Sequence, residues 1–198
     1  MYMNVSVLIC TIPKRAHMFV PLYRRLIDLT SRVSIRVEIL YDDTLDITIG
    51  EKRNRLLDRA SGTYCCFIDD DDDVSDVYFT TYETALKSGI DYDCVSLVGH
   101  YYLNGKFIKP FFHRLECNSW HEDDEGYYRC PNHLNLIKTA ICRQIGYAYL
   151  NSGEDKDFSE RLWSSGLVRT EYVHTNLLYL YYYLLKTHYL HNKVTIYK

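Results

Sequence analysis

The 198-residue sequence has no excess of basic residues, because 23 lysines and arginines stand against 26 aspartates and glutamates, a formal net charge of −3. Proteins that bind DNA or RNA usually carry a basic surface, so we expect no nucleic-acid partner. The sequence also lacks long hydrophobic runs: the most apolar late segment, 177–185, is too short and too rich in tyrosine to span a bilayer. The N-terminus has no basic region followed by a long apolar stretch. We therefore expect neither a signal peptide nor a transmembrane segment.

Cysteine pairs of the CxxC type are absent as well. The chain has seven cysteines, an odd number, and Cys65 and Cys66 are adjacent in an apolar run, where they point to opposite faces of a strand. We expect reduced, mostly buried thiols rather than a disulfide framework. A reducing compartment such as the cytoplasm is then the expected location.

Apolar residues make up 47% of the chain, which is enough for a sizeable core. The length, together with the lack of internal repeats and low-complexity linkers, predicts a single domain over residues 1–198. The 20 tyrosines suit a groove for sugars, because tyrosine packs and hydrogen-bonds at once, but they also suit half-buried core positions.

The first half of the sequence alternates between two periodicities. Apolar runs and strict alternation predict strands, and apolar residues at helical spacing predict helices. The expected order is strand 5–10, helix 15–29, strand 33–39, helix 51–60 and strand 64–68. This order is typical of an α/β fold with a mostly parallel sheet. Right-handed crossovers then place the three strand ends on one rim, where open α/β sheets bind ligands.

The second half is less regular. We expect a strand at 95–98, a hairpin turning at Asn104-Gly105, a long loop over 113–128, and helices at 139–145 and 155–163. Two glycines are expected to end helices, Gly62 the helix 51–60 and Gly166 the helix 155–163.

Five consecutive aspartates, Asp69–Asp73, follow the third strand directly. In an extended segment Asp69 and Asp71 point the same way, which lets both reach one ion. Hard cations such as Mg²⁺ and Mn²⁺ prefer these oxygen ligands, often together with phosphate oxygens. The alternative interpretation is a charged loop that caps a helix starting near Val77.

Two further charged elements stand out. Asp155 lies in the first turn of a predicted helix, where it serves either as a general base or as a partner of the helix dipole. The helix after the second strand carries four cations. They are Lys52, Arg53, Arg55 and Arg59. Most of them fit a solvated face, and Arg53 is the one expected to point inward toward an anion.

Four segments together resemble the GT-A glycosyltransferases, in particular family 2 and its small viral and collagen-type relatives. They are residues 5–11 (VSVLICT), 50–54 (GEKRN), 60–64 (ASGTY) running into 67–72 (FIDDDD), and 153–155 (GED). The resemblance extends from Val5 to about Gly166. It implies a nucleotide-sugar-binding half over 1–100 and an acceptor-side half over 101–198, with a nucleotide diphosphate sugar, in the first instance a UDP-sugar, as donor and a glycan or protein hydroxyl as acceptor.

The resemblance also implies roles for single residues. Thr11 and Asp42 are expected to contact the nucleotide base, with Arg53 nearby, and Asp69 and Asp70 to lie beside the nucleotide. Mn²⁺ or Mg²⁺ is expected to be held by Asp71 and Asp69, and His174 matches a histidine that some GT-A enzymes add as a metal ligand. Asp155 is implied as the general base of an inverting enzyme. These residues are named on the family pattern, at the positions that match it in this sequence.

The sequence departs from the family pattern in having five aspartates, so that Asp72 is an alternative to Asp71, and in its short acceptor half. Two other functions stay open. A nucleotidyltransferase also pairs carboxylates with a metal but usually has a glycine-rich phosphate loop, which residues 11–14 (TIPK) lack. The other alternative is a non-catalytic binding module. It would hold carbohydrate on Tyr101, Tyr102 and Trp120, or calcium on the aspartates.

Overall fold

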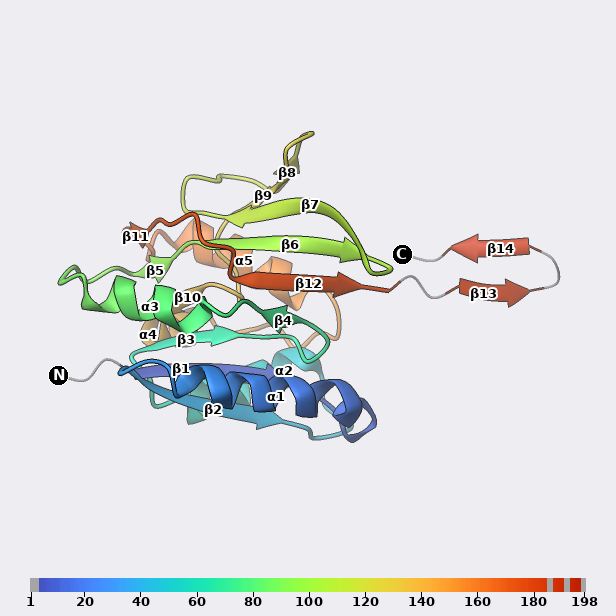
Figure 1. The fold of residues 1–198 in the computed structure, drawn as a ribbon, viewed down its shortest axis with the longest axis horizontal. Coiled ribbons are helices and arrows are strands. Elements are labelled where there is room, and N and C mark those ends of the chain that lie inside the picture. The colour runs from blue at the N-terminus through green and yellow to red at the C-terminus, as the bar shows by residue number, and fades with distance from the viewer. Residues whose placement is uncertain (1–3, 185–186, 191–192, 197–198) are drawn as a thin grey trace.

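The computed structural model describes residues 4–184, 187–190 and 193–196, which contain two six-stranded sheets (Figure 1). The first, sheet A, has the order β11-β5-β10-β3-β1-β2. Its strands are β1 (Asn4–Cys10), β2 (Arg36–Asp42), β3 (Tyr64–Phe67), β5 (Cys94–Val95), β10 (Leu136–Lys138) and β11 (Glu171–Tyr172). β1 pairs in parallel with β2 and with β3, so the parallel centre of the predicted α/β sheet is confirmed.

The second sheet, sheet B, has the order β4-β12-β6-β7-β9-β8. Its strands are β4 (Asp73–Val74), β6 (Leu97–Leu103), β7 (Lys106–His113), β8 (His121–Glu122), β9 (Tyr127–Arg129) and β12 (Tyr179–Tyr183). A separate antiparallel pair consists of β13 (Thr187–Leu190) and β14 (Lys193–Ile196). In Figure 1, sheet B lies beside sheet A, and β4 follows β3 along the chain, so the aspartates fall where one sheet leads into the other.

Helices cover both faces of sheet A. They are α1 (Ala16–Thr30), α2 (Ile49–Arg59), α3 (Tyr78–Lys87), α4 (Thr139–Ile145) and α5 (Glu154–Ser165), with a short 3₁₀ turn η1 (Pro13–Arg15) before α1. One buried cluster contains side chains of α1 and α3, and a second contains side chains of α2, α4 and α5. The sheet therefore separates two hydrophobic cores, as expected of a sheet with helices on both sides.

The period-two alternation of the strands accounts for this separation. In β3, Cys66 belongs to the first cluster and Cys65 to the second, as their adjacent positions predict. In β1, Val7 and Leu8 divide in the same way. All seven cysteines are free thiols and all but Cys10 are buried, which confirms the expectation of unpaired, mostly buried cysteines.

The ends of α2 differ from the prediction. The helix begins at Ile49, because the Thr48 hydroxyl accepts a hydrogen bond from the Glu51 amide at 3.1 Å, half of a capping box. It ends at Arg59, and the expected capping role of Gly62 is wrong. Gly62 is needed for space instead, because a Cβ there would lie 2.6 Å from the backbone nitrogen of Ser6 on β1.

In the second half, the predicted hairpin is confirmed: β6 and β7 turn at Asn104 and Gly105, both with positive φ. Gly166, at φ 62°, ends α5 as predicted. The predicted strand 95–98 is divided between β5 in sheet A and β6 in sheet B. The predicted loop 113–128 contains β8 and the start of β9, which are too short to carry a recognisable period.

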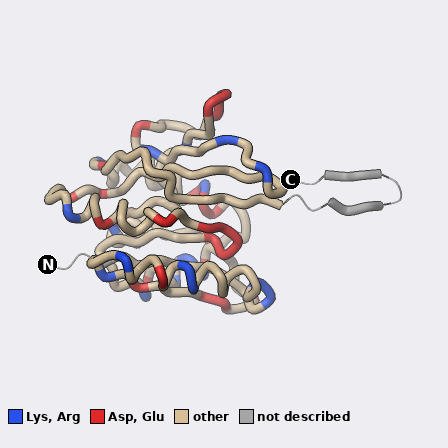
Figure 2. The backbone as a smooth tube through the Cα atoms, in the orientation of Figure 1, with Lys and Arg blue, Asp and Glu red and all other residues tan. Residues whose placement is uncertain are grey.

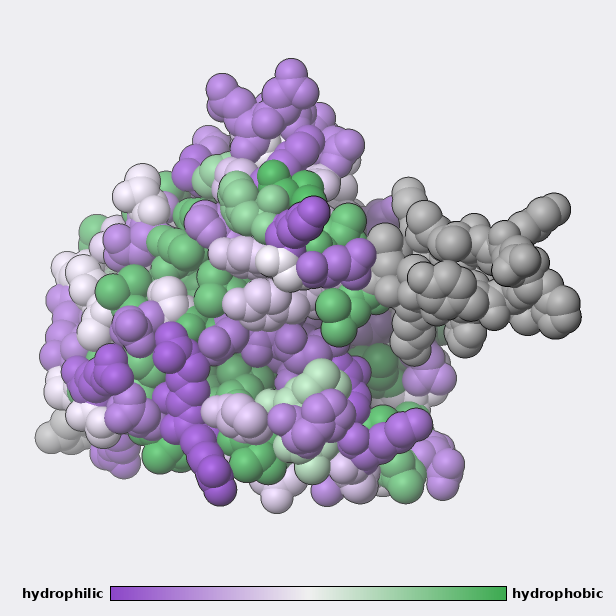
Figure 3. All heavy atoms as spheres, turned by 45° about the vertical axis from the view of Figure 1, so that its right-hand side comes forward, coloured by the Kyte–Doolittle hydropathy of each residue, from purple (hydrophilic) through white to green (hydrophobic). Residues whose placement is uncertain are grey.

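Across the part of the chain that the structure describes, no helix is both long enough and apolar enough to cross a bilayer. On the face seen in Figure 3, hydrophobic side chains form small areas separated by hydrophilic ones. The larger apolar side chains gather in the two cores on either side of sheet A.

Candidate active site

The aspartates after β3 form a tight turn rather than an extended segment. The backbone N–H of Asp72 donates to the carbonyl of Asp69 at 3.1 Å, which closes a four-residue turn. The premise that Asp69 and Asp71 alternate as in a strand is therefore wrong. The turn leads into β4 at the edge of sheet B, and Figure 2 shows the acidic cluster between the two sheets.

Asp69 belongs to a buried ion network centred on Arg53. Arg53 Nη2 lies 3.2 Å from Asp69 Oδ1, and its Nε lies 3.2 Å from Glu154 Oε1 at the start of α5. The Arg53 side chain is only 4% exposed, and its guanidinium lies 4.8 Å from the centre of the Phe67 ring. Burial opposes ionisation of Asp69, but His133, with Nε2 3.6 Å away, and Arg53 outweigh it and lower the pKa of Asp69. The predicted inward direction of Arg53 is confirmed, and it joins the two acidic elements.

Asp70 and Asp71 share a different arginine. Arg15, from η1, places Nη2 2.8 Å from Asp70 Oδ1 and 2.6 Å from Asp71 Oδ2. Asp70 is buried and also accepts a hydrogen bond from Thr11 Oγ1 at 2.6 Å. Burial raises the pKa of Asp70, against the effect of Thr11 and Arg15. Asp71 is 44% exposed, so of this pair it is the carboxylate most open to a ligand.

Asp72 faces the opposite way, into sheet B. Its Oδ2 accepts a hydrogen bond from the hydroxyl of Tyr179 at 2.9 Å, and its Oδ1 accepts from the backbone N–H of Tyr182 at 2.8 Å. Burial and the nearby charge of Asp69 raise the pKa of Asp72 well above its ordinary value. Both oxygens are thus occupied in fastening β12 to the turn, which leaves Asp71 as the better ligand candidate of the two.

Thr11 and Asp42, the residues expected at the nucleotide base, lie at the ends of the neighbouring strands β1 and β2. The N–H of Thr11 donates to the carbonyl of Asp42 at 3.0 Å, and Lys52 Nζ donates to the carbonyl of Thr11 at 2.6 Å. Lys52 is buried, so the expectation that Arg53 is the one inward cation of α2 is too narrow. Despite partial burial, hydrogen bonds from Thr44 and the charge of Lys52 lower the pKa of Asp42.

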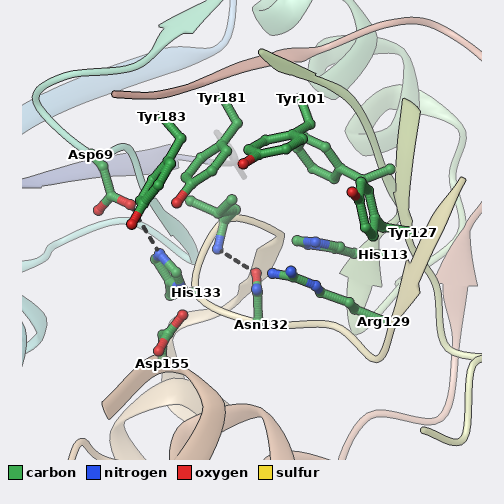
Figure 4. Close-up of a pocket in the computed structure, with 12 residues that line it drawn as sticks. Asp69, Tyr101, His113, Tyr127, Arg129, Asn132, His133, Asp155, Tyr181 and Tyr183 are labelled. Carbon is green, nitrogen blue, oxygen red and sulfur yellow. Dashed lines mark hydrogen bonds and ion pairs between the residues drawn. The ribbon is translucent and has the colours of Figure 1, made fainter. Parts of the chain in front are cut away.

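A cavity of about 300 Å³ opens between the aspartate turn, α5 and sheet B. Asp69 and Asp155, which are 86 positions apart in the chain, both line it (Figure 4). The volume is at the lower end of the range for small-molecule sites. The neighbour of Asp155 in sequence, Glu154, is buried against Arg53 instead.

Sheet B gives this cavity an aromatic wall. Neighbouring strands place side chains there at paired positions: Tyr101 opposite Tyr181, and Phe111 opposite Tyr127. The rings of Tyr101 and Tyr181 are stacked, with centroids 5.5 Å apart. Tyr102, next to Tyr101 in β6, does not line the cavity, because successive residues of a strand point to opposite faces.

Several nitrogen-bearing side chains complete the lining. Figure 4 shows Asp69, His133 and Asp155 on one side of the cavity and Arg129, His113 and Tyr127 on the other. His113 is 1% exposed, and neither ring nitrogen has a hydrogen-bond partner in the structure. Burial, with the charge of Arg129, lowers the pKa of His113 well below its ordinary value, so this ring is neutral.

His174 lies apart from these residues. Its Nε2 is 2.9 Å from the carbonyl oxygen of Ser96, its backbone N–H donates to the Ser96 hydroxyl, and its side chain is not part of the cavity lining. The structure does not bring His174 to the aspartates, since it follows β11 at the far edge of sheet A. Within the described residues, no three His, Cys, Asp or Glu side chains converge as a metal-holding group.

Sequence reasoning missed Glu154, His133, Arg129 and Arg15. Glu154 had a signal, because it stands four and eight residues before Phe158 and Leu162, the buried face of α5. Trp163, next to Leu162 in the same helix, is exposed. His133, Arg129 and Arg15 had no local signal in the sequence, because they reach the site only through tertiary contacts.

No protein-family model matches the chain, and no curated protein matches it. Solved structures do. Residues 1–349 of S. aureus TarS in complex with UDP-GlcNAc match with a TM-score of 0.60 at 14% identity, over 91% of this chain and 59% of that one. The same protein in complex with UDP matches with a TM-score of 0.60 at 14% identity, over 91% and 61%.

The likeness shows the fold: the α/β GT-A arrangement predicted from the sequence is confirmed. The chain spans about three fifths of the length of those TarS structures.

Proposed function

We propose that this chain is a metal-dependent, inverting glycosyltransferase that moves a sugar from a nucleoside diphosphate donor, UDP in the first instance, to a hydroxyl of a glycan or protein acceptor. The observation that carries the proposal is that Asp69 and Asp155, far apart in sequence, line one cavity at the ends of parallel strands. Open α/β sheets bind ligands at that rim. The shared fold with TarS, which was solved with UDP and UDP-GlcNAc, supports the nature of the donor.

The carboxylates of the turn fit Mg²⁺ or Mn²⁺. Proteins usually bind Mg²⁺ through one or two carboxylates together with substrate phosphates, so a site of three protein ligands is not required. Asp71 is 44% exposed and pairs with Arg15, and Asp69, two residues earlier in the same turn, lines the cavity. A cation bound there supplies positive charge to the diphosphate as that group departs.

The base is assigned to Asp155. A hydroxyl of the acceptor placed in the cavity gives its proton to this carboxylate while it attacks the anomeric carbon from the face opposite the diphosphate. The bond from carbon to diphosphate breaks, so the configuration at that carbon is inverted. A positioned carboxylate of this kind contributes about 10²–10⁴ in rate.

The chain's own ion pairs keep this arrangement in place before a donor arrives. Arg53 holds Asp69 against the start of α5 through Glu154, so the turn and the base are connected by one buried guanidinium. Lys52 and Thr11 tie the ends of β1 and β2 to the same region. Such preorganised charges act on a transition state without costly rearrangement.

Two measurements test the proposal. First, UDP, GDP and CMP are compared in thermal unfolding with and without Mn²⁺; UDP with Mn²⁺ is expected to stabilise most, by about 2.7 kcal/mol at a hundredfold excess over its dissociation constant. Second, UDP-GlcNAc is incubated with the protein, and the products of slow hydrolysis are followed by proton NMR. We expect UDP and free sugar, with the β anomer appearing first because the donor is α-linked.

Other products identify other functions. Release of UMP and GlcNAc 1-phosphate from UDP-GlcNAc indicates a nucleotidyltransferase, because the attack then falls on the α-phosphorus. Early appearance of the α anomer contradicts inversion and the role given to Asp155. Stabilisation by calcium or free glycan, without any effect of nucleotide, indicates a binding module instead.

A further inference from the structure

The cavity contains a cation, Arg129, that forms no salt bridge with any residue that the structure describes. Arg129 extends from β9 into the cavity, and its guanidinium lies over the ring of Trp120, 4.3 Å from the centroid. Within the described residues, no carboxylate forms an ion pair with it. Burial lowers the pKa of Arg129 despite the nearby charge of Asp155, which reflects the cost of keeping this charge partly out of water.

A second polar group beside Arg129 is also without a partner. His113, on β7, is 1% exposed and lines the same side of the cavity; the side chains of Asn132 and Asn135 lie near enough to influence its pKa, but neither ring nitrogen makes a well-formed hydrogen bond. Buried polar groups normally find partners in protein, water or ligand. A neutral imidazole presents one N–H donor, so Arg129 and His113 together offer several donors to one place in the cavity.

The shape of this side suits a sugar-like molecule. Tyr101 and Tyr127 stand with their rings edge to face, 5.7 Å apart, and Arg129 comes from the same strand as Tyr127. Aromatic faces and hydroxyls bind the apolar and polar parts of a polyhydroxylated ring. In Figure 4 this aromatic corner lies across the cavity from Asp69 and the donor side.

We propose that the half of the cavity formed by Arg129, His113, Tyr101 and Tyr127 is the acceptor subsite, and that it selects an acceptor carrying an anionic group, phosphate or carboxylate, besides the reacting hydroxyl. The inference rests on the proposed function, because it takes Asp155 as the base that receives the hydroxyl proton. The guanidinium fork pairs with either anion through two hydrogen bonds. Negative charge on the acceptor supplies the counter-ion that Arg129 lacks.

One rival role for Arg129 is to tune the base. Arg129 feels the charge of Asp155, so the two side chains interact across the cavity. In that case its removal shifts the pH profile of the reaction and leaves the choice of acceptor unchanged. The two roles therefore differ in the quantity that loss of Arg129 changes: the preference for an anionic acceptor in one case, and the pH profile in the other.

The test uses ligand-observed NMR on the full chain saturated with UDP and Mn²⁺, which keeps anionic probes out of the donor site. Three probes are compared: methyl β-D-glucopyranoside, its 6-phosphate, and methyl β-D-glucuronide. We expect the two anionic probes to bind about ten- to hundredfold more tightly than the neutral one, the value of a charge-assisted pair. The phosphate and carboxylate arms decide which anion the site prefers.

Substitutions of Arg129 test whether the preference for anionic probes depends on this residue. Arg129→Gln is expected to abolish it, and Arg129→Lys, which keeps the charge but loses the fork, to retain part of it. Arg24→Gln, on the exposed face of α1, removes the same charge elsewhere and is expected to change nothing. Equal affinity of the wild-type protein for charged and neutral probes overturns the proposal, as does a preference that survives in Arg129→Gln or a change confined to the pH profile.

Failure of the proposed function gives a different result. UDP is titrated into every variant first, and a wild-type chain that binds no UDP contradicts the glycosyltransferase. The affinities of the three probes are then compared on the nucleotide-free chain. A preference for the anionic probes that is lost in Arg129→Gln still shows an anion-binding site in the cavity, independent of the proposed sugar transfer.

Discussion

The two sheets meet at one cavity, but they differ in how their charged groups are partnered. At the end of sheet A, the turn carboxylates all have partners within the chain: Asp69 has Arg53, Asp70 and Asp71 have Arg15, and Asp72 has Tyr179. On the side of sheet B, no described carboxylate forms an ion pair with Arg129, and His113 has no hydrogen-bond partner.

The difference indicates which part of the site is complete before ligands bind. Paired charges hold their geometry, so the donor side is preorganised. Unpartnered buried groups cost free energy until something pairs with them, so the opposite side is built for a ligand that supplies the missing charge. The following predictions test this contrast, from the largest expected effect to the smallest.

Asp155→Asn removes the carboxylate that lies where the two sides meet. We expect transfer from a UDP-sugar to fall by about 10²–10⁴, because asparagine does not accept the proton, while UDP binding stays at the wild-type level. The measurement is the rate of UDP release beside a UDP titration. Glu160→Gln, on the exposed face of the same helix, is the charge-matched control. If Asp155→Asn transfers sugar at the wild-type rate, a residue other than Asp155 is the base.

Arg53→Met tests whether the pairing on the donor side stabilises the fold. It leaves the carboxylates of Asp69 and Glu154 without their shared cation, so we expect the free energy of unfolding to fall by about 3–5 kcal/mol. Urea unfolding at pH 7 measures it. Arg55→Met, two residues further along the same helix, removes an exposed arginine that pairs with Glu51 and should cost no more than about 1 kcal/mol. Equal effects of the two substitutions mean that the buried network does not stabilise the donor side.

His113→Gln tests the unpartnered side through pH. The pKa of His113 is lowered by burial, so below about pH 6.5 the unfolded chain takes up a proton that the folded chain refuses. Stability is therefore lost as the pH falls, by about 1.4 kcal/mol per pH unit for one such proton. We expect the urea midpoint of His113→Gln to fall less between pH 7 and pH 5 than that of the wild type. His17→Gln, on the exposed start of α1, should keep the wild-type slope, and an unchanged slope in His113→Gln means that its imidazole is protonated in the folded state.

The same contrast separates what the sequence could predict from what it could not. The parallel strands and α2 follow from short-range periodicity, and Asp155 from a motif at a helix start, so these positions were accessible. Arg129 was not accessible, because β9 is three residues long and falls in a stretch that reads as polar loop. The pairing of Arg15 with Asp70 depends on a turn that no local period indicates.

His174 shows the limit of reading a role from a family pattern alone. Its position in the sequence matched a metal ligand, but hydrogen bonds to Ser96 hold it at the junction of β5 and β6. The imidazole of His174 lies against the carbonyl of Ser96, between β5 of sheet A and β6 of sheet B. Whether a histidine at this position meets the backbone or a metal depends on where sheet A ends and sheet B begins, which the sequence does not indicate.

Arg15→Gln is expected to have the smallest effect, and it tests whether the pairing on the donor side is exchangeable. Arg15 lies on Asp70 and Asp71, where it competes with a divalent cation for the same oxygens. Because Arg15 and Asp71 are both partly exposed, the pair is worth at most about 1 kcal/mol, so its loss should lower the Mn²⁺ concentration needed for half-maximal UDP binding by up to about fivefold. Arg25→Gln, which pairs instead with Asp73 and Asp76, should leave that concentration unchanged. A higher Mn²⁺ requirement or weaker UDP binding in Arg15→Gln means that the arginine binds the diphosphate, which would make it part of the donor site rather than a substitute for the metal.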